Sequence, residues 1–353
     1  MLPGEARSGA QHAPLLLRPG IQKLAVFRAL QLGDMLCAVP ALRALRAAQP
    51  GARITLVGLP WAAQFARRFH CYIDDFIAFP GHPAFPEQPP QQQQAPAFYR
   101  AMHAHRFDLA LQMHGSGEIS NGIVRAFGAD AVAGFISGSV SDSGAAADAD
   151  CFVAYPESGA EPLRLLRLVE HLGARGATAA LEFPIGDEDR NELRASPFAA
   201  GIREGAYFCV HPGARNRAKC WPPHAFAQVA DALAEEFGLQ PVLTGSPRET
   251  DLTAMVAAHM RTPAVDSAGP LSIGAMAALM QGARLLLCND TGVSHIAAGL
   301  RLPSVVIFSS ADMQRWAPLD RDLHRCLRDA EGLRAQAVLA QARELLRQTA
   351  QAD

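Results

Sequence analysis

The hydrophobic residues of this chain form short apolar runs that alternate with longer segments of helical periodicity. The runs at 283–287 and 304–308 are mostly apolar and have the length of a strand that is buried on both faces. Between such runs, apolar side chains recur at every third or fourth position, as on an amphipathic helix. Strands that alternate with helices in this way predict parallel sheets with helices on both faces.

Two successive series of these elements are present, which predicts an α/β protein with two doubly wound, Rossmann-like domains facing a cleft. The first series of expected strands comprises 23–28, 54–57, 76–79, 109–112 and 132–135. The second comprises 207–210, 241–243, a short strand near 265, 283–287 and 304–308. We expect an N-terminal domain at 21–183, a linker region at 184–205, a second domain at 206–330 and a C-terminal helix at 331–353.

Three segments lie outside this pattern. Residues 1–20 are rich in Gly, Pro and Ala, and we expect them to form a disordered leader whose run of three leucines is too short for a signal segment. Residues 80–98 are rich in Pro and Gln, and residues 137–150 are rich in Ser, Gly, Asp and Ala. Both are expected to be surface loops.

Composition argues against several classes of protein. The net charge is −2 and no dense basic face is evident, so a nucleic-acid partner is not expected. Seven scattered cysteines without a C-x-x-C pair indicate reduced thiols in a cytosolic protein. No cluster of His, Cys and Asp has the spacing of metal ligands, so neither a metal nor a cofactor is expected. No apolar segment is long enough to cross a membrane.

The most informative polar residues follow the run 283–287, where an Ala-rich helix begins. Ligands of open α/β sheets bind at the carboxyl ends of strands. The backbone N–H groups of Thr291, Gly292 and Val293 are expected to face that crevice. Unsatisfied donors and the helix dipole both favour negative charge there. The sequence therefore predicts a phosphorylated ligand.

Side chains of the same motif are further candidates. Thr291 and Ser294 are expected to contact phosphate, and Asp290 to bond either the ligand or the loop itself. His295 follows Thr291 by one helical turn and lies on the same face. Its alternative role is that of a buried, hydrogen-bonded core residue.

A second candidate loop leaves the first strand of the second domain. It contains His211, Gly213, which permits close backbone approach, and the cations Arg215, Arg217 and Lys219. We expect it to bind an anion, although a merely solvated loop remains the alternative. Trp221 at its end is expected to pack rather than to stack on a ligand.

Another strand-to-helix turn contains Glu249. This carboxylate is a candidate for a ribose contact, as in dinucleotide-binding folds. The equally weighted alternative is that it complements the dipole of the following helix.

Asp34 is the candidate for acid–base chemistry. Gly33 permits a tight turn after the first strand, and a helix is expected from there to Ala48, with Pro40 bending its early part. Asp34 then either caps that helix or takes a proton from an attacking hydroxyl as a general base.

Several stretches together resemble one known family. They are Leu32-Gly33-Asp34 with Pro40-Ala41-Leu42-Arg43, Phe107 to Gln112, His211-Pro212-Gly213 with Lys219 and Trp221-Pro222, Asn289 to Gly292 with His295, and Arg315 to Leu319. In combination they are similar to the motifs of glycosyltransferase family nine, the bacterial lipopolysaccharide heptosyltransferases. The resemblance extends over roughly residues 21–325.

The resemblance implies a GT-B fold and an inverting, metal-independent glycosyltransferase that moves a sugar, expected to be a heptose, from a nucleotide-diphosphate donor such as ADP-heptose. It implies an acceptor in the lipopolysaccharide core or a related lipid-linked or oligosaccharide glycan. By kinship the enzyme is cytoplasmic, with peripheral contact to the inner face of the cytoplasmic membrane left open.

The resemblance also implies roles for single residues. Asp34 matches the general base, Lys219 a donor-phosphate contact, Glu249 a ribose contact, and Asp290 to Gly292 the diphosphate loop. Gln112 and His114 are the expected acceptor contacts.

Two other functions fit the same architecture. A nucleotide-sugar epimerase would release a free sugar without any acceptor. A non-catalytic nucleotide-sugar-binding protein would not need the carboxylate of Asp34.

Overall fold

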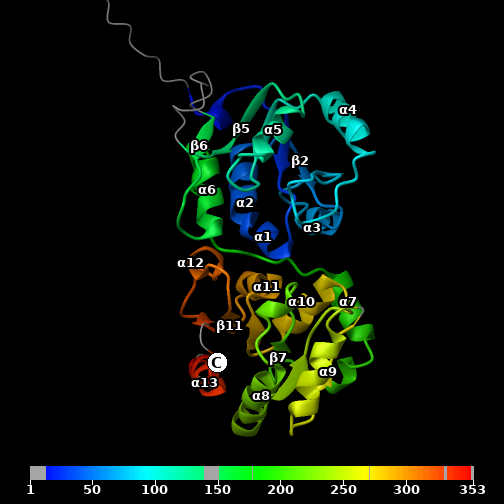
Figure 1. Cartoon of the computed structure of the whole chain (residues 1–353), viewed down its shortest axis with the longest axis vertical. Coiled ribbons are helices and arrows are strands. Elements are labelled where there is room, and N and C mark those ends of the chain that lie inside the picture. The colour runs from blue at the N-terminus through cyan, green and yellow to red at the C-terminus, as the bar shows by residue number, and fades with distance from the viewer. Residues whose placement is uncertain (1–12, 139–150, 177, 270, 330–331, 351–353) are drawn as a thin grey trace, which may run out of the picture. The chain divides into compact units, whose positions relative to one another are not determined.

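The computed structural model describes residues 13–138, 151–176, 178–269, 271–329 and 332–350, which form two compact units (Figure 1). Unit 1 consists of Met1–Leu30, Pro40–Glu157 and Arg164–Thr178, and unit 2 of Gln31–Val39, Ser158–Leu163 and Ala179–Asp353. Unit 2 therefore includes a short segment from near the start of the chain, which contains Asp34.

Unit 1 is built on a six-stranded parallel sheet in the order β3-β2-β1-β4-β5-β6. Its strands are β1 Lys23–Phe27, β2 Arg53–Gly58, β3 Asp75–Ala78, β4 Leu109–Gln112, β5 Ala131–Ile136 and β6 Phe152–Ala154. Its helices are α2 Val39–Ala48, α3 Ala62–Arg68, α4 Ala95–His105, α5 Ser120–Arg125 and α6 Glu161–His171. Phe27 on β1 meets Phe79 and Phe127 edge-on in the core.

Unit 2 repeats this topology, with the parallel order β12-β11-β10-β7-β8-β9. Its strands are β7 Tyr207–His211, β8 Gln240–Leu243, β9 Val265–Asp266, β10 Leu286–Asn289, β11 Ser304–Phe308 and β12 His324–Arg328. Its helices are α1 Leu32–Cys37, α7 Asp187–Ala195, α8 Pro223–Phe237, α9 Thr250–His259, α10 Ile273–Gln281, α11 Gly292–Leu300, α12 Met313–Trp316 and α13 Ala335–Ala350. The apolar face of α13, with Leu345 and Leu346, joins the core formed by α8 and the sheet.

In both sheets the strand order reverses beside the first strand of the unit. The reversal lies between β1 and β4 in unit 1, and between β7 and β10 in unit 2. Ligands of doubly wound folds bind at this switch point, outside the carboxyl ends of the strands. The predicted fold class, two Rossmann-like α/β domains of the GT-B type, is confirmed.

The prediction of a disordered leader is wrong for Leu15–Leu17. Leu15–Leu17 form a short 3-10 helix, η1, in which Leu15 and Leu16 are buried. The backbone N–H of Leu16 donates to the carbonyl of Leu172 at 2.8 Å, which ties this segment to the end of α6. The burial of two leucines therefore orders the segment despite its Gly/Pro-rich neighbours. The rest of the expected leader, residues 1–12, lies outside the described residues.

The single helix predicted from Gly33 to Ala48 is two helices. Residue Ala38 separates α1 from α2, and Pro40 stands at the start of α2. Proline has no N–H and its ring collides with the carbonyl four residues earlier, so α1 cannot continue through it. The break coincides with the boundary between the two units at Val39 and Pro40.

Other elements differ from the sequence prediction. Helix α7 lies inside the expected linker region 184–205, where it packs against α10 in unit 2. Strands β6 and β12 and the short helix α12 were not predicted. Helix α4 begins within the expected loop 80–98, and most of the expected loop 137–150 lies outside the described residues.

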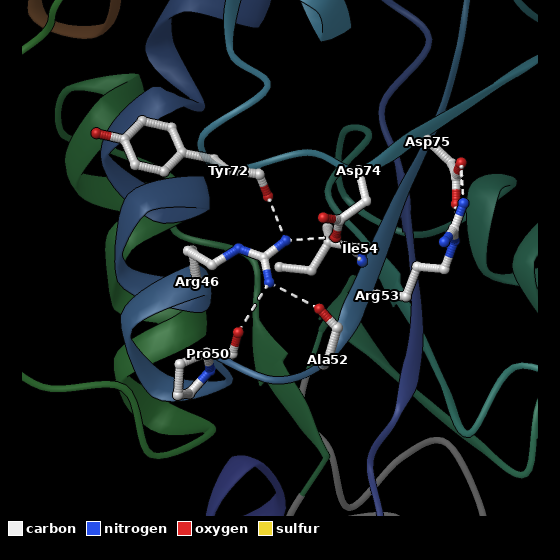
Figure 2. A network of polar contacts seen from close by, with 8 residues as sticks. All are labelled: Arg46, Pro50, Ala52, Arg53, Ile54, Tyr72, Asp74 and Asp75. Carbon is white, nitrogen blue, oxygen red and sulfur yellow. Dashed lines mark hydrogen bonds and ion pairs between the residues drawn. The ribbon is translucent and has the colours of Figure 1, made fainter.

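Arg46 connects the end of α2 to two loops of unit 1, as Figure 2 shows. Its guanidinium donates to the carbonyls of Ala52 at 2.7 Å and Tyr72 at 3.3 Å, and it pairs with Asp74. Asp74 also accepts from the backbone N–H of Ile54 at 2.7 Å. The network fixes the segment before β2 and the segment before β3 to one helix, and it is a structural device rather than a candidate site.

Candidate functional site

The switch point of unit 2 brings together two of the motifs found in the sequence. Strands β7 and β10 are neighbours in register, with Cys288 beside His211. The chain leaves β7 as the loop 212–221 and leaves β10 through Asp290 into α11. Both segments therefore start at the carboxyl edge where a ligand of this fold is expected.

Asn289 fastens these two segments together, a role that sequence reasoning missed. Its side chain is fully buried, accepts from the backbone N–H of Trp221 at 2.9 Å, and donates to the carbonyl of Pro212 at 2.8 Å. One amide thus holds both ends of the loop 212–221. A buried Asn directly before a helix N-terminus was the available signal, because a buried amide must find partners.

Lys219 and Asp290 face each other across this edge. The Lys219 Nζ lies 3.7 Å from the Asp290 Oδ2, and the lysine side chain is 31 % exposed against 11 % for the aspartate. Burial raises the pKa of Asp290, Lys219 lowers it, and the charge of Asp34 raises it again. The cation is therefore accessible, as a phosphate contact requires.

The N-terminus of α11 has the donors that the sequence predicts. The backbone N–H of Ser294 donates to the Thr291 carbonyl at 3.0 Å, whereas those of Thr291, Gly292 and Val293 have no acceptor among the described residues. The Ser294 hydroxyl is fully buried and donates to the Thr291 carbonyl at 2.8 Å. This edge therefore offers main-chain donors to a ligand, whereas the Ser294 hydroxyl is already bonded within the first turn of the helix.

Asp34 is not the N-cap of α1. The cap is Gln31, and Asp34 stands three residues later in a capping box, where its Oδ2 accepts from the Gln31 N–H at 3.3 Å. Its charge raises the pKa of Asp290, and the neighbouring Gly33 packs against Gly292, two residues after Asp290, within unit 2.

Helix α1 is packed directly on α11. A Cβ atom on Gly33 would lie 2.8 Å from the His295 Cδ2, and one on Gly292 would lie 3.1 Å from the Leu32 Cδ2. His295 is buried and its Nδ1 lies 3.7 Å from the Cys37 Sγ. Burial and the nearby His324 lower the pKa of His295 to about 4, so it is neutral at pH 7. His295 is a core residue of this helix pair, the alternative that the sequence left open.

His211, Gly213 and Glu249 form one cluster at the ends of β7 and β8. The buried His211 Nδ1 lies 3.0 Å from the Thr244 Oγ1, and burial lowers its pKa against the opposing charge of Glu249. A Cβ on Gly213 would come within 2.0 Å of the Glu249 Oε1, so only glycine leaves space for that carboxylate. The other oxygen, Oε2, accepts from the N–H and hydroxyl of Ser246 at 2.8 and 2.7 Å.

Only part of the predicted cationic loop is available to an anion. Arg217 forms a bidentate pair with Asp251 at 2.7 and 2.8 Å and donates to the Arg248 carbonyl at 2.9 Å. It therefore connects the short helix η4, Arg217–Lys219, to α9. Trp221 is 2 % exposed and packs edge-on against Phe226 in the core, as predicted.

The two expected acceptor contacts lie at the switch point of unit 1. Gln112 is fully buried: its amide donates to the Ser120 hydroxyl at 2.6 Å, and its carbonyl accepts from the Phe135 N–H at 3.0 Å. Its polar atoms are thus committed to the fold.

His114 is also at this switch point, and it is stacked between Phe27 and Phe85, with ring centroids 5.4 and 4.2 Å away. Its Nδ1 accepts from the Ala29 N–H at 3.3 Å. Burial and the positive charge of Arg28 lower its pKa to about 3. His114 is therefore a neutral histidine: with Nδ1 accepting from Ala29, the proton lies on Nε2, which can donate a hydrogen bond but provides no positive charge.

Within the described residues, no group of three or more His, Cys, Asp or Glu side chains is placed to hold a metal ion. None of the described helices is both long and apolar enough to span a membrane.

Comparison with known proteins identifies the family. The model of glycosyltransferase family 9 (heptosyltransferase) matches residues 96–339, more than half of the chain. The chain belongs to glycosyltransferase family 9. The family predicted from the motifs is thereby confirmed.

Individual relatives match in part. Lipopolysaccharide heptosyltransferase 3 of Escherichia coli K12 is 30 % identical over 158 residues, which cover 44 % of this chain and 45 % of the relative. Lipopolysaccharide heptosyltransferase 2 of the same strain is 30 % identical over 117 residues, 32 % of this chain and 33 % of that protein. The matched segments thus span less than half the length of these relatives.

Solved structures share the fold over nearly the whole chain. A family 9 glycosyltransferase from Veillonella parvula has a TM-score of 0.77 at 18 % identity and covers 94 % of this chain and 99 % of its own. The ADP-heptose lipopolysaccharide heptosyltransferase II of E. coli has a TM-score of 0.70 at 20 % identity, covering 93 % and 99 %. E. coli heptosyltransferase WaaC with ADP has a TM-score of 0.69 at 19 % identity, covering 92 % and 100 %.

Proposed function

We propose that the protein is an inverting, metal-independent glycosyltransferase that transfers a heptose from ADP-heptose to a sugar hydroxyl of a lipopolysaccharide core. The observation that carries this proposal is the composition of one edge in unit 2. Three main-chain N–H groups at the start of α11 and the partly exposed ammonium of Lys219 suit a diphosphate, and Asp34 follows Gly33, which packs against Gly292 in the same unit.

The donor would bind with its diphosphate at the N-terminus of α11. Lys219 and the N–H groups of Thr291, Gly292 and Val293 would neutralise the charge that builds up on the leaving ADP. Glu249, held by Ser246 at the start of α9, is the candidate for the ribose hydroxyls, because acidic residues hold ribose in related folds. The choice of ADP-heptose is supported by the names of the relatives and of the structures that share the fold.

Asp34 would act as the general base. As the acceptor hydroxyl attacks the anomeric carbon, its proton passes to the Asp34 carboxylate while the bond from that carbon to the diphosphate oxygen breaks. The sugar passes through an oxocarbenium-like state, by analogy with glycoside hydrolysis. Attack opposite the leaving group inverts the anomeric centre.

The acceptor and the location of the enzyme follow from the same proposal. The donor of this reaction is a water-soluble nucleotide sugar, and the acceptor is a lipid-linked glycan. We therefore place the enzyme in the cytoplasm, in peripheral contact with the inner face of the membrane. His114 at the switch point of unit 1 is the better candidate for an acceptor contact, because the polar atoms of Gln112 are occupied within the fold.

The test is a transfer assay with ADP-heptose and a heptose-deficient lipopolysaccharide core, in the presence of EDTA. We expect release of ADP together with a glycan heavier by one heptose, measured by mass spectrometry. Heptose transfer that requires an added divalent metal would contradict the metal-independent mechanism. Free sugar formed without acceptor would indicate an epimerase, and ADP-heptose binding without any product would indicate a binding protein.

A further inference from the structure

Helix α1 belongs, by its contacts, to a different unit from the elements that flank it in the chain. Strand β1 before it and helix α2 after it are parts of unit 1, whereas Gln31–Val39 is part of unit 2. The chain enters unit 2 after Leu30 and leaves it at Pro40, where the helix is broken. The contacts of α1 therefore hold the candidate base, Asp34, in unit 2.

The contact between α1 and α11 depends on two glycines that face each other. An added Cβ on Gly292 would lie 3.3 Å from the backbone nitrogen of Gly33, and one on Gly33 would lie 3.4 Å from the Gly292 Cα. The Cβ added on Gly33 would also lie 2.8 Å from the Cδ2 atom of the His295 ring. The absence of both side chains lets the two helices approach closely at the residue next to Asp34.

The residues around this contact are arranged to keep it in place. His295 is 5 % exposed and fully buried Cys37 lies beside its ring, so the end of α1 is anchored as well as its start. The lowered pKa of His295 keeps its ring uncharged at pH 7, so no cation has to be buried between the two helices.

We infer that α1 is a positioning element of the nucleotide-binding unit: seated on α11 through Gly33, Gly292 and His295, it holds the Asp34 carboxylate at a fixed place beside the Asp290 loop. The role given to Asp34 rests on the proposed function. The seating of α1 does not, and it can be tested separately. The base and the donor site then belong to the same unit.

Gly33→Ala tests the positioning. Gly33 has an ordinary helical backbone rather than a positive φ, and alanine favours helices over glycine, so the backbone itself tolerates the change. The new methyl group would lie 2.8 Å from the His295 Cδ2, so the buried ring or α1 must shift, and we expect α1 to be displaced. We expect kcat to fall at least about tenfold while the Kd for ADP, measured by calorimetry, stays within about twofold. Gly122→Ala, where an added Cβ in α5 meets nothing within 4 Å, is the matched control.

A disulfide tests the seating without an activity assay. A Cβ on Gly292 would lie 3.3 Å from that of Leu32, close to the spacing of a disulfide, and Leu32→Cys removes the Cδ2 atom that crowds the site. In a Cys71→Ser background, which removes the exposed native thiol, the Leu32→Cys/Gly292→Cys protein should oxidise to link the tryptic peptides 29–43 and 285–301. The oxidised protein should turn over as fast as the same protein after reduction.

The outcomes separate the two proposals. Full turnover of Gly33→Ala, no disulfide, or turnover that is lost on oxidation and regained on reduction would each overturn the inference, the last because α1 would have to leave α11 during the reaction. If the wild-type chain transfers no sugar, the proposed function fails, and the yield of the disulfide still decides whether α1 is seated on α11.

Discussion

At the scale of single residues, the capping box of α1 gives Asp34 a bond within the helix in addition to its proposed role as the base. The N-cap of α1 is Gln31. Its backbone N–H donates to the Oδ2 of Asp34. The N-cap role that the sequence offers as an alternative is wrong, and the capping-box bond is compatible with the proposed role of Asp34 as a base. A variant that keeps the helix bond and removes the basicity separates them.

Asp34→Asn is that variant. The amide oxygen still accepts from the Gln31 N–H, but the side chain can no longer take a proton. Turnover should fall by about 10²–10⁴-fold. Affinity for ADP and the Tm should remain close to those of the wild type. Steady-state transfer, calorimetry and thermal unfolding on one preparation measure all three. Wild-type turnover in this variant would remove Asp34 as the base.

Lys219→Ala should weaken binding of ADP by about one to two decades, because a charge-assisted contact contributes about 1.5–3 kcal/mol. Calorimetry in EDTA measures the change. Arg248→Ala removes a neighbouring exposed cation whose side chain forms no hydrogen bond or ion pair with the described residues, and it should leave ADP affinity nearly unchanged. Equal effects of the two substitutions would show that only general positive charge matters.

Sequence reasoning found the residues of the site better than their partners. It placed the free amides of α11, the packing of Trp221 and the accessible Lys219 in the right surroundings. It did not foresee that Asp251 engages Arg217, because that pair joins η4 to α9, two elements whose spacing is set only by the sheet. Nor did it foresee that Gln112 is occupied, which depends on β5 lying beside β4.

At the scale of elements, the end of β10 shows how one strand controls a neighbouring loop. Asn289→Ala leaves the Trp221 N–H and the Pro212 carbonyl without their partner. A buried group left unsatisfied costs about 1–3 kcal/mol, so unfolding free energy should drop by about that amount or more. Urea unfolding measures the loss, and weaker ADP binding should accompany it because Lys219 lies on the loosened loop. Unchanged stability would mean that water replaces both bonds.

Helix α7 illustrates what the pattern of the sequence could not reveal at this scale. Most of its residues are polar or charged, so it lacks the apolar stripe by which the other long helices were recognised. Its start is fixed locally, since the Asp189 Oδ2 accepts from the Gly186 N–H at 2.9 Å, and three acidic residues occupy the first turn. Those signals are present in the sequence, but tertiary packing on α10 decides the outcome.

At the scale of the whole molecule, buried histidines whose pKa is lowered, among them His114, His295 and His324, predict loss of stability in acid. The pKa is lowered to about 3 for His114 and to about 4 for His295 and His324, against 6.5 in a flexible chain. Their contribution is fully present above pH 6.5. It is lost as the pH falls toward 4, because only the unfolded chain binds the protons. Each histidine adds at most about 1.4 kcal/mol per pH unit to the slope of the unfolding free energy against pH.

Chemical unfolding between pH 7.5 and 4.5 measures this slope. In His324→Gln the pH dependence of the unfolding free energy should be smaller, by an amount that corresponds to about one proton. Because His295 and His324 both lie in unit 2, that unit should lose stability first. A slope that is the same in wild type and His324→Gln would contradict the assignment.

The division into two α/β domains was predictable at this scale because the periodicity of strands and helices is local. The membership of Gln31–Val39 was not, because it depends on contacts with residues more than 250 positions away. The sequence predicts a turn at Gly33 and a phosphate-facing N–H at Gly292, and it cannot distinguish these roles from close helix packing.

The placement of α1 in unit 2 also sets an order of events during translation. Cys37 and its neighbour His295 are 258 residues apart in sequence. At about 5–20 residues per second, α1 leaves the ribosome roughly 13–50 s before α11 exists to receive it. During that interval β1, β2 and β4 can pair once they have been synthesised, but α1, which contains Asp34, cannot yet pack on α11. A nascent chain arrested before α11 should therefore have a formed first sheet and an undocked first helix.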